Sequence, residues 1–297
     1  MNLRDLEYVV AVAETLNFGK AAERCNVSQP TLSGQIKKLE EYLGVPLFER
    51  DNKRVAVTAV GQEVARRARE VLQGARDLVE CAKNGAHPLG GEYRLGAFPT
   101  LAPYLLPEII ASSASLFPEL RVVPVEEKSA ELIASLKKGK IDAALLALPL
   151  EEDGLIAKAL FDDPFYLAAA KDHPLATVRS VTAKEFARYR PMLLEEGHCL
   201  REQALDVCRL AGAHEGAFKA AGLETLRRMT AAGHGVTLMP AIACEKTDEG
   251  SIAYVPFDAP APSRRIALAR RARSTRTEAF SALAGVVTEA ANKKLGP

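Results

Sequence analysis

The sequence predicts an α+β winged helix-turn-helix domain, a long linker helix, and an α/β domain built from two subdomains. Three observations predict this fold class. Short helical periods separated by a tight turn open the chain, a seven-residue apolar repeat follows, and strand and helix patterns then alternate to the C-terminus. We place the domain limits at 1–60, 61–90 and 91–297. Within the last domain we expect subdomain I from residues 91–163 and 268–297, and subdomain II from residues 164–267.

The composition excludes several classes of protein. Of the 297 residues, 48% are hydrophobic and 26% are charged, a balance typical of folded domains rather than disordered chains. Because no apolar run approaches the roughly 20 residues of a membrane helix and no secretory leader is recognisable, we expect a cytoplasmic protein with no membrane partner. The net charge is only +1, so DNA binding would depend on where charges are placed. Five cysteines do not suggest a structural disulfide framework.

The N-terminal segment has the pattern of a helix-turn-helix. Apolar positions predict a helix over Leu3–Leu16, a short one over Lys20–Cys25 and a third over Ser28–Leu43, whose first turn tolerates Pro30. The break at Asn26-Val27 makes the turn between the second and third helices. In such a motif the N-terminal end of the later helix enters the major groove of DNA. Its first turns offer the side chains expected to reach base edges: Ser28, Gln29, Pro30, Thr31, Ser33 and Gln35.

Two short strands are expected next, over residues 45–50 and 55–58, and they bracket a basic loop to form a wing. Arg50, Lys53 and Arg54 are then placed to contact phosphates. The alternative is a three-helix core whose exposed polar residues only face solvent. The order of turn, cap and wing favours the DNA reader.

A long helix is predicted from Thr58 to Lys83. Apolar residues recur in it at alternating spacings of four and three, which is typical of a helix that pairs with a second copy; they are Val64, Ala68, Val71, Ala75, Leu78 and Ala82. Because the repeat is rich in alanine, it could also pack on its own domain. Residues 85–91, with three glycines and a proline, predict a hinge.

From residue 92 onward the patterns alternate, which predicts parallel α/β units and a cleft between two subdomains. We expect strands over residues 93–97, 122–126, 143–148, 165–170, 192–194 and 265–269, and helices over residues 103–117, 130–138, 183–189, 224–232 and 276–293. Ligands prefer the carboxyl ends of such strands. Thr100, Ser129 and the segment 197–199 all fall at strand ends.

The segment Gly197-His198-Cys199-Leu200-Arg201 places a thiol beside two potential cations, and Cys208 follows nine residues later. A thiolate is stabilised by neighbouring cations and by a helix N-terminus. In one continuous helix the two cysteines would lie about 13 Å apart on opposite faces, whereas a disulfide tolerates no more than about 7 Å. A peroxide would oxidise Cys199 to a sulfenic acid, and Cys208 would convert it to a disulfide after the helix unwinds. The alternative is that both are inert packing residues.

The chain resembles LysR-type transcriptional regulators over nearly its whole length. Residues 18–61 resemble their winged helix-turn-helix, and the C-terminal half resembles their effector domain, itself similar to periplasmic binding proteins. Within the family the resemblance is to hydrogen peroxide sensors, and it is carried by residues 95–100, 103–107, 197–201, 203–204, 208, 223–227 and 231–233. Gly19 and Gly34 depart from the family pattern, which leaves the operator sequence open. Ser129 stands where the family usually has threonine.

The resemblance implies that Cys199 is the peroxidatic thiol and Cys208 its resolving partner. It also implies a peroxide pocket formed by Thr100, Ser129, His198 and Arg264. The implied partners are double-stranded promoter DNA, hydrogen peroxide as the signal, further copies of the chain in a dimer or tetramer, and RNA polymerase.

Other chemistry is weakly indicated. No cysteine or histidine spacing resembles a zinc site, so we expect no metal and no cofactor. We interpret Cys25, Cys81 and Cys244 as packing or surface residues. One rival hypothesis is a LysR-type regulator that binds a small metabolite in the cleft. Another is a thiol peroxidase or disulfide oxidoreductase, which is disfavoured because no Cys-x-x-Cys motif occurs and the DNA reader would be unexplained. We therefore expect a regulator rather than an enzyme.

Overall fold

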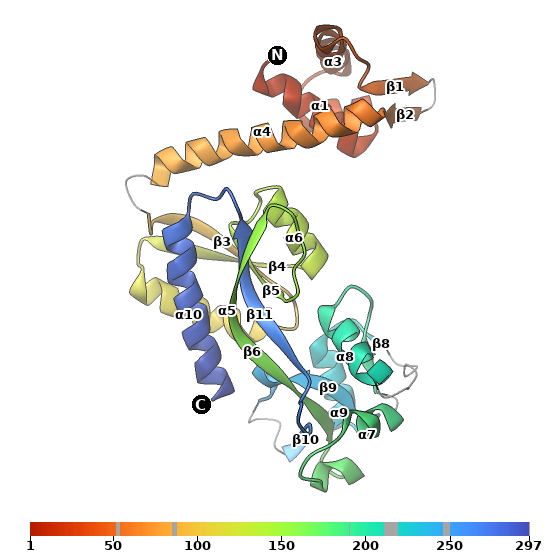
Figure 1. The fold of residues 1–297 in the computed structure, drawn as a ribbon, viewed down its shortest axis with the longest axis vertical. Helices are drawn as coiled ribbons and strands as arrows, with labels where there is room; N and C mark the ends of the chain where they lie inside the picture. Colours follow the sequence, from red (N-terminus) through yellow and green to blue (C-terminus); the bar gives the residue numbers. More distant parts are fainter. Residues whose placement is uncertain (52–53, 85–87, 190, 211–218, 246–249, 297) are drawn as a thin grey trace. The chain divides into compact units, whose positions relative to one another are not determined.

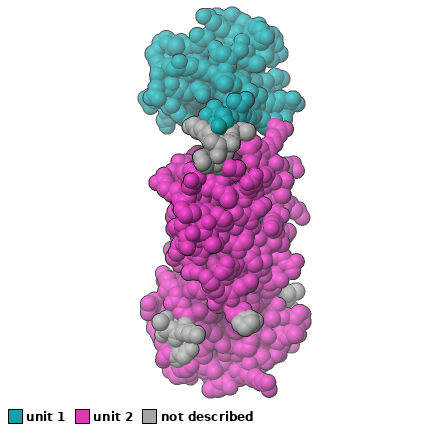
Figure 2. All heavy atoms as spheres, turned by 90° about the vertical axis from the view of Figure 1, so that its left-hand side faces the viewer, with its two compact units in different colours: residues 1–83 teal, residues 84–297 magenta. Residues whose placement is uncertain are grey.

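The structure is a computed structural model of the chain, shown in Figure 1. It describes residues 1–51, 54–84, 88–189, 191–210, 219–245 and 250–296. Two compact units are distinguished in Figure 2: unit 1, residues 1–83, and unit 2, residues 84–297. Among the described residues, no helix combines the length and the apolar character needed to cross a membrane.

Unit 1 contains the three predicted helices. They are α1 (Leu3–Thr15), α2 (Phe18–Arg24) and α3 (Gln29–Leu43). Asn26, at φ 53°, makes the tight turn before α3, and the side chain of Ser28 accepts a hydrogen bond from the backbone N–H of Thr31 at 3.3 Å. A serine cap of this kind satisfies one of the unpaired amides at a helix start. The helix-turn-helix prediction is confirmed.

The wing and the long helix follow. Strands β1 (Phe48–Asp51) and β2 (Arg54–Val57) pair antiparallel, and α4 runs over Ala59–Asn84. The predicted apolar repeat of α4 divides between two environments. Ala68 of the repeat is buried against Leu6 and Leu72 of its own unit, whereas Val71 and Leu78 of the repeat are exposed, as is the neighbouring Val79.

Unit 2 is built on a seven-stranded sheet in the order β10-β6-β11-β5-β3-β4, with β9 also paired to β6. Strand β3 (Gly91–Ala97) is parallel to both β4 (Leu120–Glu126) and β5 (Ala143–Ala147). Strands β6 (Leu155–Ala170) and β11 (Ser263–Arg271) are long and antiparallel to each other. Apolar residues of both halves of the sheet belong to one continuous buried core.

The expectation of parallel α/β units is therefore wrong for the strands that pair with β6 and β11, all of which are antiparallel to them. The chain passes between the two halves of unit 2 on the long strands β6 and β11, which run in opposite directions, rather than on helical crossovers. Only the buried end of β6 was predicted; its first part, which is largely exposed, was missed although it is also rich in apolar residues. Strands β9 (Thr237–Pro240) and β10 (Ile252–Pro256) were not predicted, and both pair antiparallel with β6.

Helices cover both faces of the sheet. In Figure 1, α5 and α10 lie on one side of strands β3 to β5 and α6 on the other. A second group of helices surrounds the far end of β6, with the two-stranded parallel ladder of β7 and β8 among them. The bounds are α5 (Ala102–Leu116), α6 (Ser129–Lys137), α7 (Ala183–Arg188), β7 (Leu193–Leu194), α8 (Cys199–Leu210), β8 (Lys219–Ala220), α9 (Leu223–Ala231), α10 (Thr277–Leu295) and two 3-10 turns over Pro174–Thr177 and Ala241–Ala243.

Candidate functional site

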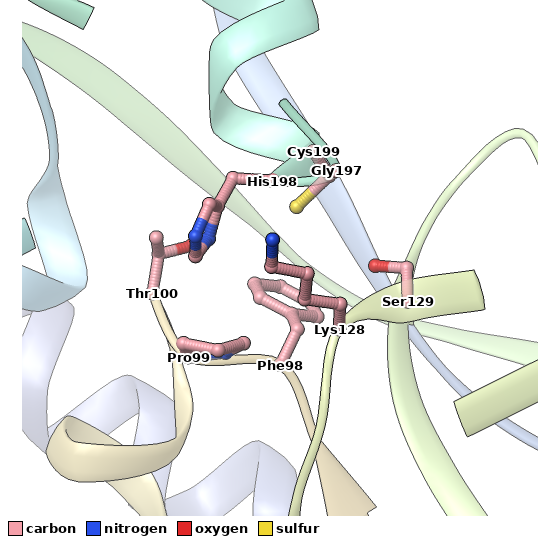
Figure 3. A pocket seen from close by; sticks show the side chains of 8 residues that line it. All are labelled: Phe98, Pro99, Thr100, Lys128, Ser129, Gly197, His198 and Cys199. Atoms are coloured by element: carbon pink, nitrogen blue, oxygen red, sulfur yellow. The ribbon is translucent and has the colours of Figure 1, made fainter. Parts of the chain in front are cut away.

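Three segments that are distant in sequence meet at one small pocket of unit 2. About 160 Å³ of space, part of it open to solvent, is lined by Phe98, Pro99, Thr100, Lys128, Ser129, Gly197, His198 and Cys199. Figure 3 shows the sulfur of Cys199, the ammonium of Lys128 and the hydroxyl of Ser129 directed toward the same opening. The structure thus brings together four of the residues named from the sequence: Thr100, Ser129, His198 and Cys199.

The topology explains this meeting. Strands β3 and β4 are parallel neighbours, so their carboxyl ends lie at the same edge of the sheet. Residues 98–100 follow β3, and residues 128–129 follow β4. The third segment turns at Gly197, whose φ of 88° is in the left-handed region that favours glycine. Cys199 is then the first residue of α8, where unpaired backbone amides favour an anion.

Thr100 is held in place by hydrogen bonds from a residue of a buried ion pair. Arg264 donates from Nη1 to Thr100 Oγ1 at 2.8 Å and from Nη2 to the Thr100 carbonyl at 3.1 Å. Its Nε donates to Asp163 at 2.9 Å, and both charged side chains are fully buried. The other carboxylate oxygen of Asp163 accepts from the backbone N–H of Ile242 at 3.0 Å. Arg264 does not line the pocket but holds the hydroxyl that does.

Strand pairing places this ion pair. Asp163 of β6 lies directly opposite Arg264 of β11, and the next pair along is Asp162 with Arg265. Because successive strand residues point to opposite faces, the first pair is buried and the second is exposed. Arg265 Nε lies 2.7 Å from Asp162 Oδ1, but about half of each of these side chains is exposed.

His198 is buried and does not supply a positive charge. Burial, and to a lesser extent the neighbouring charge of Lys128, lowers the pKa of His198, although a hydrogen bond with the Ala221 backbone opposes the shift. A histidine with a lowered pKa is neutral at pH 7. The sequence interpretation of His198 as a cation beside Cys199 is therefore wrong.

Arg201, the second expected cation, is also directed elsewhere. Its side chain is buried, its Nη1 donates to the carbonyl of Leu194 at 3.2 Å, and it is not among the residues that line the pocket. Two residues, or about half a turn of helix, separate its position from that of Cys199, so their side chains leave α8 in different directions.

Ser129 carries an unused hydroxyl. Its Oγ is buried, and no described residue forms a hydrogen bond with it. A buried hydroxyl without a partner costs stability, so such a group is often matched by a ligand. Ser129 is also the first residue of α6, beside Lys128 at the carboxyl end of β4.

Cys199 and Cys208 lie on one continuous helix. Helix α8 spans Cys199–Leu210, and Cys199 is a free, half-buried thiol. Nine residues of helix separate the two backbone positions by about 13 Å, on opposite sides of the cylinder. The side chain of Cys208 is outside the described part of the chain.

The residues expected to read DNA occupy the start of α3. Ser28, Gln29, Pro30 and Thr31 are exposed, whereas Ser33 and Gln35 are half-buried. Of the expected phosphate contacts, Lys53 lies outside the described residues, and so do the side chains of Arg50 and Arg54.

Sequence reasoning missed two residues of the site. Lys128 lines the pocket next to Ser129, and as the basic residue at the end of β4 it was a usable signal. Asp163 supports Arg264, and the signal was a pair of adjacent aspartates in one strand and a pair of adjacent arginines in another. No group of three or more potential metal ligands occurs among the described residues.

Comparisons with known proteins assign the chain to a family. Residues 3–62 match the bacterial regulatory helix-turn-helix of the lysR family, and residues 86–292 match the LysR substrate binding domain. The chain belongs to the LysR family. This confirms the resemblance and the fold class predicted from the sequence.

Among its LysR relatives the chain is similar to OxyR proteins. It is 43% identical over 291 residues to a hydrogen peroxide-inducible genes activator of Pectobacterium carotovorum, covering 97% of this chain and 96% of the relative. It is also 43% identical to the DNA-binding transcriptional dual regulator OxyR of Escherichia coli K12, covering 97% and 95%.

Solved structures agree with this assignment. Full-length OxyR from Pseudomonas aeruginosa superposes with a TM-score of 0.75 at 37% identity, covering 97% of this chain and 94% of that one. A mutant OxyR of Corynebacterium glutamicum, described as H2O2-bound, superposes with a TM-score of 0.68 at 32% identity, covering 99% and 94%.

Proposed function

We propose that this LysR-family protein is a transcription regulator that senses hydrogen peroxide through Cys199. The thiolate sulfur attacks one peroxide oxygen, the O–O bond breaks, and the other oxygen leaves as water after taking up a proton. The sulfur of Cys208 then attacks the sulfenic sulfur of Cys199, the S–O bond breaks, and a disulfide forms while the hydroxyl leaves as a second water with the proton of the Cys208 thiol. Peroxide is thereby reduced by two electrons, and the two thiols are oxidised.

The observation that carries this proposal is the size and content of the pocket at Cys199. Its space of about 160 Å³ includes a part open to solvent, so the enclosed volume is smaller still, and even this upper bound falls below the roughly 300–1,000 Å³ typical of pockets for drug-sized ligands. A diatomic oxidant such as hydrogen peroxide needs far less space than a metabolite. The similarity to peroxide-inducible activators supports the same choice.

The pocket offers the hydrogen bonds that a peroxide needs. Because Arg264 donates to Thr100 Oγ1, the threonine hydroxyl proton is free to donate to a peroxide oxygen. Ser129 contributes the unpartnered hydroxyl. Neutral His198 either accepts a proton or donates one, which suits a group beside a leaving oxygen. Together these groups orient the O–O bond toward the Cys199 sulfur.

The disulfide requires helix α8 to change. Positions 199 and 208 are about 13 Å apart in the continuous helix, and a disulfide needs no more than about 7 Å. At least part of α8 must therefore unwind. We infer that this local unfolding is the switch that repositions the DNA-binding units.

The partners follow from the same proposal. The start of α3 reads the major groove of promoter DNA, while the wing contacts phosphates. We infer that the exposed apolar side of α4, with Val71 and Leu78, pairs with a second copy, and that two dimers form a tetramer. The regulator acts in the cytoplasm on oxidative-stress genes with RNA polymerase, and it consumes peroxide once per oxidation rather than catalytically.

A stoichiometric peroxide pulse tests the proposal. Trypsin separates the cysteines into peptides 189–201 and 202–209, so mass spectrometry detects their linkage directly. We expect the linked peptide to form and the footprint on promoter DNA to change over the same range of peroxide. Linkage without a change in the footprint, or a thermal shift with an organic metabolite and no linkage, would contradict the proposal.

A further inference from the structure

Lys128 is held beside the reactive sulfur by two features of the segment that leads into α8. Its Nζ donates to the carbonyl of Glu196 at 3.0 Å. The Lys128 side chain occupies the space where a side chain at position 197 would lie. A Cβ on Gly197 would come within 3.2 Å of the Lys128 Cδ and 3.3 Å of its Nζ. In Figure 3 the Lys128 ammonium points toward the sulfur of Cys199.

Each of the other ionisable side chains near the pocket is uncharged, is paired with another residue, or is directed away from the pocket. His198 is uncharged at pH 7 because burial lowers its pKa. Arg264 is paired with Asp163, and the Arg201 guanidinium donates to Leu194. Glu195, which acts on His198, is exposed to solvent. Across the described residues, no carboxylate forms an ion pair with Lys128.

We propose that Lys128 is the positioning residue for Cys199, with Glu196 and Gly197 holding its ammonium beside the sulfur. The inference deepens the proposed function, since it names the charge that would make Cys199 reactive toward peroxide. A neighbouring cation stabilises the negative charge of an attacking sulfur. The helix N-terminus adds to it, but its partial charge is smaller than the full charge of an ammonium.

The bridging position of Lys128 explains why the site depends on the fold. Lys128 belongs to the end of β4, whereas Cys199 belongs to α8, and the two meet only when the segment 195–199 is docked on the sheet edge. A chain with the cysteine segment undocked would lose the cation as well as the pocket. Reactivity is thereby confined to the folded, reduced protein.

Alkylation of Cys199 by iodoacetamide tests this inference without using peroxide. The full-length protein is labelled at pH 7, and the label on tryptic peptide 189–201 is counted by mass spectrometry. Lys128→Met should slow labelling by about tenfold, because the attacking sulfur loses the neighbouring positive charge. Lys128→Arg keeps the charge and should restore most of the rate. Lys138→Met, an exposed lysine at the opposite end of α6, is the matched control and should change nothing.

Two results would overturn the inference. One is a Lys128→Met protein with the wild-type labelling rate, and the other is an equal loss of rate in Lys128→Met and Lys138→Met. A thermal unfolding curve for each variant separates a loss of fold from a loss of charge, and Lys128→Arg provides a second test if Lys128→Met is destabilised. If labelling depends on Lys128 but peroxide leaves Cys199 reduced, the proposed function fails while the inference on Lys128 stands.

Discussion

The DNA-reading end of unit 1 and the pocket of unit 2 are built in opposite ways. The recognition residues lie within eight consecutive positions at the start of one helix, residues 28–35. The pocket gathers residues 98–100, 128–129 and 197–199 from three strand and helix ends, and a buried ion pair supports it from behind. One helix presents the first set. The second exists only when the whole α/β unit is folded.

This difference predicts where substitutions act. Changes at the start of α3 should alter DNA recognition and leave the chemistry of Cys199 intact. Changes behind the pocket should affect both stability and peroxide response. The following substitutions test that separation.

The largest effect is expected from Cys199→Ser. Without the thiol, the peroxide-dependent change in the promoter footprint should disappear, while the DNA affinity of the reduced form stays within about twofold, because unit 1 is unchanged. The matched control is Cys244→Ser, since this half-buried thiol donates to the Pro240 carbonyl at 3.5 Å and lies outside the pocket. A Cys199→Ser protein that still responds to peroxide would contradict the account.

The two adjacent ion pairs of β6 and β11 provide the next test. Asp163→Asn leaves the buried guanidinium of Arg264 without its carboxylate, which should lower the free energy of unfolding by about 3–5 kcal/mol. It should also slow Cys199 oxidation, because Arg264 holds Thr100. Asp162→Asn breaks the exposed pair with Arg265 and should cost less than about 1 kcal/mol. Chemical denaturation measures the loss of stability in each variant, and mass spectrometry after a peroxide pulse measures the oxidation of Cys199. Equal losses of stability, or wild-type oxidation in Asp163→Asn, would show that the buried pair does not support the pocket.

In unit 1, Gln29→Ala should lower discrimination between operator and mutated operators by about 1–3 kcal/mol. Arg54→Ala should weaken binding to all sequences and reduce the slope of log affinity against log salt by about one. Competition binding at several salt concentrations separates the two effects. Neither variant should change the rate at which peroxide oxidises Cys199, and a changed rate would refute the independence of the two regions.

The smallest effect concerns His198. Burial lowers the pKa of His198 below its ordinary value of 6.5, so the unfolded chain takes up a proton at a higher pH than the folded protein does. The free energy of unfolding should therefore fall as the pH drops through about 6.5 toward the lowered pKa. His198→Asn should lose this part of the pH dependence, and the exposed His234→Asn should keep it. Urea unfolding at pH 7.5 and pH 5.5 measures the difference.

The same contrast explains how far the sequence could be interpreted. The helices of unit 1 were predicted to within two residues at most ends, because capping and apolar spacing are local signals. The strand directions in unit 2 were not predicted correctly, because antiparallel pairing of β6 with β11 depends on residues about a hundred positions apart. The two cations assigned to Cys199 were wrong for a related reason. Adjacency in sequence suggested His198 and Arg201, whereas burial neutralises the first and α8 directs the second away.

The place of Lys128 in the pocket could not be predicted from the spacing of residues in the sequence. It lies 71 positions before Cys199, and only the parallel pairing of β3 with β4 brings its strand end to the pocket. The role of Asp163 likewise follows only from the strand register, which places it opposite Arg264.

The central claim is that linking Cys199 to Cys208 requires α8 to unwind, and hydrogen exchange tests it most directly. Amide exchange is followed over residues 199–210 in the reduced protein and after a stoichiometric peroxide pulse, with the linked tryptic peptide confirming oxidation. The account predicts that amides within α8 exchange at least about tenfold faster in the oxidised protein while those of α5 and α10 keep their protection. A linked pair of cysteines with unchanged protection throughout α8 would contradict it.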